Sequence, residues 1–325
     1  MSAASTVSTV DLRARVGSVR LANPVMTASG TAGHGAELAG YLDLAALGAV
    51  VVKSVSATAW AGNPPPRLLP LPAAMLNSVG LQNPGVEEWL KTQLPPLART
   101  GATVVASIWG FRADEYRVTA AAIAAAVRGG RSGPPGAVVA VETNISCPNV
   151  EDRSRMFAHS AEGIAEAVGA TVDGLDGALP VWAKLSPNVT DLPVMAAAAV
   201  GAGAEAVTLV NTVMGLAIDP VTGRARLGAG GGGLSGPAIH PIAVRAVYEC
   251  RAALPDVPIV GVGGVTTGEE AAELLAAGAD AVQVGTATFA DPRAPARVLA
   301  ELHDWCAEHG VATIDDVKGR AHDAR

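Results

Sequence analysis

The segment NISCPN at residues 144–149 places one thiol, Cys147, between two carboxamides and follows an apolar run that is typical of a buried strand. A cysteine at the C-terminal end of a strand can be a nucleophile, a proton acceptor, a metal ligand or a packing residue. Asn144 and Asn149 each offer a hydrogen-bond donor and an acceptor, which match the edge of a cyclic amide better than a metal ion. The arrangement therefore favours a positioned base beside a polar, planar substrate.

Lysines and glycines end other apolar runs of the chain. Lys53 and Lys184 each close such a run, and an ammonium group in that position is costly unless a negative group meets it, so both predict anions of a ligand. The glycines of GVGG at 261–264 and GT at 285–286 predict a phosphate site made of backbone N–H groups, to which Gly236 adds another donor.

A fold must bring these residues together, and the apolar runs indicate which fold it is. Eight runs are typical of short buried strands, namely NPVMTASG (23–30), GAVVVKS (48–54), GATVVAS (101–107), GAVVAVETN (136–144), LPVWAKLSP (179–187), GAEAVTLVNT (203–212), VPIVGVGGV (257–265) and GADAVQVGT (278–286). Alanine-rich segments predict helices at 38–47, 86–99, 113–128, 161–172, 191–202, 237–253, 267–277 and 292–308. Eight parallel strands with covering helices indicate a TIM (β/α)8 barrel. The alternative is a doubly wound sheet, but no GxGxxG follows the first strand.

Three segments fall outside the repeat. Residues 55–84 and 212–235, rich in Gly, Pro or Asn, predict loops over the C-terminal mouth of the barrel, and residues 10–21 predict an N-terminal hairpin that plugs its bottom. At 325 residues, half of them hydrophobic, we expect residues 1–325 to form a single barrel domain. The strand ends would then converge on one mouth: Ser29, Gly30, Lys53, Ser54, Ser107, Asn144, Cys147, Lys184, Asn211, Thr212, Gly263, Gly264, Gly285 and Thr286.

Composition excludes several classes of function. The net charge of −7 and the lack of clustered Lys and Arg argue against nucleic-acid binding. Three scattered cysteines are too few for a disulfide scaffold, a zinc site or an iron-sulfur cluster, and they indicate a reducing compartment. The first residues lack a signal-peptide pattern and the longest apolar stretch, around 192–204, is too short to span a bilayer, so we expect a cytoplasmic protein without membrane contact.

The motifs resemble one family over nearly the whole chain, the FMN-dependent dihydroorotate dehydrogenases of class 1. The resemblance rests on NPVMTASG, KS at 53–54, NSVGLQN at 77–83, NISCPN, AKLSPNVTD, NTVMGLAID, GGLSGPAIHPIA, GVGGV and AVQVGTA. The NTVMGLAID and GGLSGPAIHPIA stretches look more like subtype B, a catalytic subunit that works with a separate flavin and iron-sulfur subunit, than like the fumarate-using subtype A. The resemblance implies oxidation of (S)-dihydroorotate to orotate in pyrimidine biosynthesis.

The resemblance also assigns residues. Cys147 would remove a proton from C5 of dihydroorotate while a hydride leaves C6 for the flavin. The positions that match orotate contacts are Lys53, Asn77, Val79, Gly80, Leu81, Asn144, Asn149, Asn211 and Thr212. The positions that match FMN contacts are Ser29, Lys53, Ser54, Asn144, Lys184, Val210, Gly236, Gly263, Gly264, Gly285 and Thr286, with Ser107 where the family usually has Asn. No metal ligand is expected.

Partners and alternatives follow from the same resemblance. An NAD-linked route would require a partner subunit that supplies FAD and a 2Fe-2S centre, and a homodimer of this chain is expected. The alternatives are a dihydropyrimidine dehydrogenase-like flavoenzyme, a flavin-binding subunit without its own turnover, and a colourless phosphate-binding barrel isomerase. The segment EDRSRMFAH at 151–159 departs from the glycine-rich loop of subtype B, which puts lid motion in question.

Four further residues are assigned no chemistry. His159 and His240 are expected at the surface of a loop or helix near the mouth. Cys250 and Cys306 fall inside predicted helices and are expected to be buried structural thiols.

Overall fold

The computed structural model describes residues 10–130, 137–146 and 157–323, and in these ranges eight parallel strands form one sheet that closes on itself. The strands are β3 (Val25–Thr27), β4 (Val50–Val51), β7 (Val104–Ile108), β8 (Val138–Asn144), β9 (Val181–Leu185), β10 (Ala206–Leu209), β13 (Ile259–Val262) and β14 (Ala281–Val284). They pair in the order β3-β14-β13-β10-β9-β8-β7-β4. A parallel bridge between Met26 and Ala49 joins the two outer strands, and Gly48 N donates to Val25 O at 2.9 Å. The predicted TIM barrel is confirmed.

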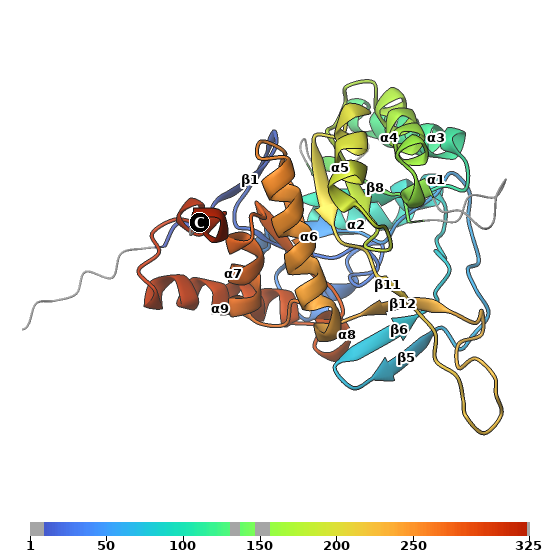
Figure 1. The fold of residues 1–325 in the computed structure, drawn as a ribbon. Helices are drawn as coiled ribbons and strands as arrows, with labels where there is room; N and C mark the ends of the chain where they lie inside the picture. Colours follow the sequence, from blue (N-terminus) through green and yellow to red (C-terminus); the bar gives the residue numbers. More distant parts are fainter. Residues whose placement is uncertain (1–9, 131–136, 147–156, 324–325) are drawn as a thin grey trace, which may run out of the picture.

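Helices cover the outside of this barrel (Figure 1). Six match the predictions closely: α3 (Ala113–Arg128), α4 (Ala161–Leu175), α5 (Leu192–Gly201), α6 (His240–Ala253), α7 (Gly268–Ala276) and α9 (Ala294–Glu308). Segment 86–99 is helical but divided into α1 (Val86–Glu88), a π-helical stretch, η3 (Trp89–Gln93), and α2 (Leu94–Arg99). Short elements complete the set: η4 (Phe157–His159), η5 (Pro237–Ile239), α8 (Ala287–Ala290), η6 (Ile314–Asp316) and α10 (Arg320–Asp323). Among the described residues, no helix is long and apolar enough to cross a membrane.

The predicted α-helix at 38–47 is wrong. The segment contains two 3-10 turns, η1 (Glu37–Gly40) and η2 (Leu44–Ala46). The first turn ends at Gly40, a residue that disfavours helix interiors. The carboxylate of Asp43 then accepts a hydrogen bond from Ala45 N at 3.0 Å, which starts a new turn.

An N-terminal hairpin fills the bottom of the barrel, as predicted. Strands β1 (Ala14–Val16) and β2 (Val19–Leu21) pair antiparallel. Val16, Val19 and Leu21 are buried against a layer of barrel residues made of Met26, Ala49, Val51, Val105, Ala140, Trp182, Ala206, Val260 and Ala281. The carboxylate of Glu205 accepts hydrogen bonds from Ser18 N at 2.6 Å and Ser18 Oγ at 2.8 Å, which fixes the hairpin turn to the start of β10. The N-terminal end of the barrel is therefore an apolar core that is separate from the mouth.

The two segments predicted as loops contain strands, so that prediction is wrong in part. Strands β5 (Leu68–Leu71), β6 (Ala74–Asn77), β11 (Val213–Gly215) and β12 (Gly232–Ser235) of the described chain form an antiparallel sheet in the order β11-β12-β6-β5, to one side of the helical ring (Figure 1). Pro70 lies in the edge strand β5, where a missing N–H is tolerated. At Gly233 a Cβ would come within 2.1 Å of Thr212 Oγ1, so this glycine permits close approach of the chains.

A substitution in the apolar bottom layer should destabilise the protein although the layer lies far from the mouth. Trp182 belongs to this layer and is fully buried. Trp182→Ala should lower the free energy of unfolding by about 3–5 kcal/mol, because it removes a large side chain from a packed layer. The measurement is urea denaturation followed by circular dichroism.

Trp182→Phe is the matched control. This variant keeps an aromatic ring and removes an indole N–H that has no hydrogen-bond partner among the described residues. Its free energy of unfolding should therefore fall clearly less than that of Trp182→Ala. Equal losses for the two variants would show that ring packing is not what this position contributes.

Candidate active site

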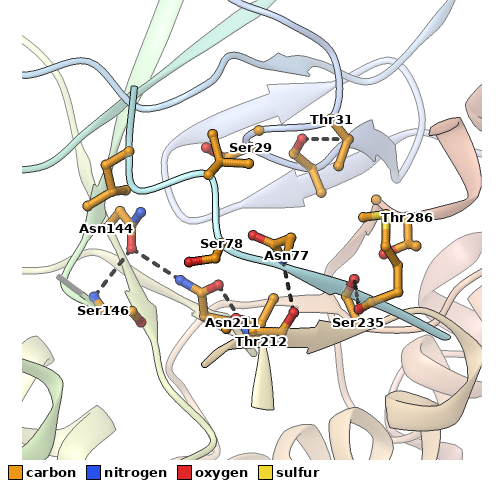
Figure 2. A pocket seen from close by; sticks show the side chains of 18 of the residues that line it. Ser29, Thr31, Asn77, Ser78, Asn144, Ser146, Asn211, Thr212, Ser235 and Thr286 are labelled. Carbon is orange, nitrogen blue, oxygen red and sulfur yellow. Dashed lines mark hydrogen bonds between the residues drawn. The ribbon is translucent and has the colours of Figure 1, made fainter. Parts of the chain in front are cut away.

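A cavity of about 610 Å³ lies at the C-terminal ends of the barrel strands, bounded on one side by the antiparallel sheet (Figure 2). Cavities of this size hold small ligands and cofactors. The predicted site residues that line it are Ser29, Lys53, Ser54, Asn77, Val79, Gly80, Leu81, Asn144, Lys184, Val210, Asn211, Thr212, Gly236, Gly263, Gly264, Gly285 and Thr286. The barrel and the sheet thus bring together residues that are far apart in the sequence.

Carboxamides and hydroxyls form a connected row along the cavity. Asn144, at the end of β8, accepts a hydrogen bond from Asn211 Nδ2 at 3.2 Å and donates to Ser54 Oγ at 3.2 Å. Asn211 Oδ1 accepts from Thr212 N at 2.8 Å. Asn77, from β6 in the antiparallel sheet, points into the same space, and its Nδ2 donates to Gly233 O at 3.0 Å (Figure 2). The row presents fixed donors and acceptors to a planar polar ligand.

Ser107 does not line the cavity. It is fully buried on β7, and its Oγ lies 2.8 Å from Ser54 Oγ, which in turn lies 3.2 Å from Ser29 Oγ. Ser54, which lines the cavity, therefore connects Ser107 with Ser29 through their hydroxyl groups. A direct contact of Ser107 with a cofactor stays a prediction.

A loop of backbone groups from residues 79–81 forms another wall. Gly80 has φ 71° and Leu81 has φ 63°. Residues other than glycine rarely adopt this left-handed backbone conformation. Asn83 holds the loop from below: it is buried, donates to Leu81 O at 3.0 Å and accepts from Gly85 N at 2.9 Å. The backbone of this loop is therefore presented to the cavity in one fixed arrangement.

Glycines build the wall that the sequence predicts for phosphate. Gly236 and Gly264 have φ values of 94° and 72°, which favour glycine. His240 lies beneath this wall, and the prediction that it is a surface residue is wrong. It is 7% exposed, with Nδ1 2.8 Å from Gly263 O and Nε2 3.1 Å from Glu273 Oε2. His240 therefore positions the glycine turn after β13.

Lys184 lies at the floor of the cavity, and the protein itself supplies its anion. The side chain is almost fully buried, and Nζ lies 3.8 Å from Glu142 Oε1 and 3.4 Å from Gln283 Oε1. Glu142 and Gln283 are fully buried inside the barrel. Lys184 thus has an internal anionic neighbour, which sequence reasoning did not find, and it also lines the cavity.

Lys53 reaches the cavity from the end of the second barrel strand, and its backbone N donates to Gly33 O at 2.8 Å. His34 follows Gly33. Burial, and next the nearby Lys53 ammonium, lower the pKa of His34 from 6.5 to about 4, against the opposing effect of Glu37. His34 is therefore neutral at neutral pH and leaves the positive charge of this corner to Lys53.

Several lining residues were not predicted. Ser186 and Asn188 lie in AKLSPNVTD, a motif noted for the resemblance but not assigned to a ligand. Asn188 donates to Thr212 O at 3.0 Å and accepts from Met214 N at 2.9 Å, so it connects the barrel to the antiparallel sheet. Other unpredicted lining residues include Thr31, Trp60, Asn63, Met75, Ser78, Phe111, Ser146 and Ser235. Trp60 and Phe111 lie in segments without periodicity, and no sequence signal pointed to them.

Three predicted features lie outside the described residues, namely Cys147, Asn149 and residues 151–156. Ser146 is the last residue before that gap.

Cys250 and Cys306 are fully buried in α6 and α9, and burial raises the pKa of the Cys250 thiol to about 12. Both are structural thiols, as predicted. His159 is exposed, also as predicted. Within the described ranges, no group of three or more His, Cys, Asp or Glu side chains could hold a metal ion.

Comparison with known proteins agrees with this geometry. A sequence model of the dihydroorotate dehydrogenase family matches residues 11–305. The chain is similar to the dihydroorotate dehydrogenase B (NAD+) catalytic subunit of Desulforudis audaxviator, with 47% identity over 94% of this chain and 96% of the relative. It is 42% identical to the subunit of the same name from Geobacter sp. strain M21, over 95% and 97% of the two chains.

A third relative bears the name of the other subtype. The chain is 43% identical to a protein of Solibacter usitatus over 96% of this chain and 98% of that protein, which is provisionally named dihydroorotate dehydrogenase A (fumarate). The family match covers most of the chain and the relatives are matched almost end to end. This chain therefore belongs to the dihydroorotate dehydrogenase family of oxidoreductases.

Proposed function

We propose that the chain is the FMN-dependent catalytic subunit of a dihydroorotate dehydrogenase, which oxidises (S)-dihydroorotate to orotate in pyrimidine biosynthesis. The observation that carries the proposal is the row of Asn77, Asn144 and Asn211 in a cavity that Lys53 also lines. Several carboxamides suit the two carbonyls and ring N–H groups of the substrate, and one ammonium suits its carboxylate.

The residues of the cavity fit FMN. Its phosphate would bind the glycine wall of Gly236, Gly263, Gly264 and Gly285 with Thr286, where the missing side chains let a phosphate approach the backbone N–H groups. Ser29, Lys53, Ser54, Asn144, Lys184 and Val210 would hold the remainder of the cofactor, and Ser107 would act through Ser54. When bound, FMN supplies an acceptor for the hydride that leaves C6 of the substrate.

The substrate would bind between the carboxamide row and the fixed loop at 79–81. Asn77, Asn144, Asn149, Asn211 and Thr212 would hold the ring, Val79, Gly80 and Leu81 would add backbone contacts, and Lys53 would bind the carboxylate. Cys147 would take the proton from C5, which is mildly acidic beside a carbonyl. A thiol with an ordinary pKa of about 8.5 is a competent base, so activity should rise on the alkaline side of neutrality.

The first test replaces the base. Cys147→Ala should keep FMN but lower the rate of flavin reduction by dihydroorotate by about 10²- to 10⁴-fold, the usual contribution of a positioned general base. The measurement is anaerobic stopped-flow absorbance of the purified holoprotein. Cys306→Ala, at a buried thiol in α9, is the control and should reduce flavin at the wild-type rate. Unchanged reduction in Cys147→Ala would remove this residue from the mechanism.

The second test distinguishes dihydroorotate from dihydrouracil, which lacks the carboxylate. Wild-type protein should reduce its flavin with dihydroorotate and far less with dihydrouracil. Lys53→Met should lower kcat/KM for dihydroorotate by about 10- to 100-fold, as expected for the loss of one charge-assisted hydrogen bond, and should lower the weak reaction with dihydrouracil by a clearly smaller factor, because only the cofactor contact of Lys53 is lost there. Equal rates with the two substrates in the wild type would favour a dihydropyrimidine dehydrogenase-like activity.

The third test concerns the neutral histidine beside Lys53. Because the pKa of His34 is lowered to about 4 in the folded protein, the unfolded chain binds a proton there between pH 6.5 and 4 while the folded protein does not. The contribution of His34 to stability is therefore complete above about pH 6.5 and is lost as the pH falls to about 4. His34→Gln should lose less unfolding free energy than wild type over this interval, measured by urea denaturation. Parallel pH profiles would contradict the assignment.

We further propose that the chain acts as a single domain in a cytoplasmic complex, as a homodimer that passes electrons to a partner subunit with FAD and a 2Fe-2S centre. Two relatives named catalytic subunit of an NAD+-linked enzyme support this proposal. The chain has three cysteines, which is too few to hold such a centre itself. Co-purification of a flavin and iron-sulfur protein, with NAD+ reduction only in its presence, would distinguish this route from direct reduction of fumarate.

A further inference from the structure

Three buried polar side chains cross the inside of the barrel directly below the cavity. Glu142 on β8 accepts a hydrogen bond through Oε2 from Gln283 Nε2 on β14 at 2.8 Å, although the two residues are 141 positions apart. Its other oxygen, Oε1, faces Lys184 Nζ on β9 at 3.8 Å and accepts no hydrogen bond within the described part of the chain. Glu142 and Gln283 are fully buried, and Lys184 is 5% exposed.

Burying these charged side chains costs free energy, and the need to fill the barrel does not explain why they are there. A carboxylate in the interior is costly unless it is paired and hydrogen-bonded, and replacing such a pair by apolar residues is often neutral or stabilising. The layer below is built around Trp182 from apolar side chains such as Met26 and Val260, so the barrel can be filled by packing. The charged layer lies next to the cavity, and its lysine is the member that lines the cavity wall.

The distances indicate how the pair works. Lys184 Nζ lies beyond hydrogen-bonding distance of Glu142 Oε1 and makes a long contact of 3.4 Å with Gln283 Oε1. Gln283 uses its amide N to hold Glu142 and its amide O to face Lys184, so it fixes the carboxylate and the ammonium relative to each other. Because Lys184 also lines the cavity, its ammonium lies between the ligand space and the buried carboxylate of Glu142.

We propose that Glu142, oriented by Gln283, is a positioning residue that holds Lys184 at the floor of the cavity and offsets its positive charge. The proposal rests on the proposed binding of FMN and adds a role in setting the redox balance. Reduced FMN carries more negative charge than oxidised FMN, so a lone lysine would favour the reduced form strongly. With Glu142 beneath it, Lys184 favours that form less, and the potential of the bound flavin is lower.

The first experiment uses protein from which FMN has been removed, so it does not depend on the cofactor. Thermal unfolding is compared for Glu142→Gln, Lys184→Met and the double variant. Each single variant leaves one buried partner uncompensated and should lower the melting temperature by roughly 5 °C or more. The double variant removes both charges and should be no less stable than Lys184→Met alone. Additive losses would overturn the pairing of Glu142 with Lys184.

The second experiment measures the midpoint potential of bound FMN at about pH 6.5, well below the usual titration range of lysine. Glu142→Gln should raise the preference for reduced over oxidised FMN by about tenfold, which is about 30 mV for a two-electron couple. Lys184→Met should shift the potential in the opposite direction. Glu205→Gln, the same chemical change at the hairpin end of the barrel, is the matched control and should leave the potential unchanged.

The two experiments separate the failure of this inference from the failure of the proposed function. Protein that binds FMN with the same potential in wild type and Glu142→Gln, or with a lower potential in the variant, would overturn the inference and leave the proposed function intact. Protein that takes up no FMN would overturn the proposed function, and with it the redox role of Glu142. The stability comparison would still decide whether the two side chains are coupled.

Discussion

The closure of eight parallel strands into a barrel is the constraint on which the rest of the structure depends. Parallel strands end on the same side, so every residue that follows a strand is delivered to one mouth. The bridge between Met26 and Ala49 completes this ring by joining the first and second barrel strands. Without that closure, Lys53 after β4 and Ser29 after β3 would lie at opposite edges of an open sheet instead of lining one cavity.

Inside this ring the chemical character changes from one end to the other. The hairpin and the layer around Trp182 form an apolar bottom, and the layer above holds Glu142, Lys184 and Gln283. The carboxamide row and the glycine wall come next, at the open end. This order is physically reasonable, since polar groups near the mouth can hydrogen-bond to a ligand while the bottom layer supplies packing. Stability and function are thus assigned to different layers of the same strands.

The antiparallel sheet of β5, β6, β11 and β12 gives the cavity its second side. It contributes Asn77 and, through Asn188, is connected to Thr212 after the sixth barrel strand. The loop at 79–81 follows β6 directly, so its position depends on the pairing of β6 with β12 and on the anchor at Asn83. The substrate side of the proposed site is therefore built jointly by the ends of barrel strands and by segments outside the barrel repeat.

Much of the barrel and of the lining set could be predicted because strand ends are local features of the sequence. Lys53, Asn144 and Gly263 each follow an apolar run, and the period of strands and helices identifies their common mouth. The Glu142–Gln283 contact could not be predicted, because it joins residues 141 positions apart and depends on the register of strands across the barrel. The sheet strands were missed because Pro70 and the glycines of β12 hide their pairing, and the contact between the Ser107 and Ser54 hydroxyl groups could not be predicted because it joins two different strands.

The most direct test of the account is an anaerobic titration of the purified protein with dihydroorotate, followed by the absorbance of the flavin and by quantification of orotate. We predict a yellow protein that contains FMN, loses its visible absorbance on addition of dihydroorotate and forms one orotate for each flavin reduced. A colourless protein, or a yellow protein whose absorbance does not change with dihydroorotate, would contradict the central claim.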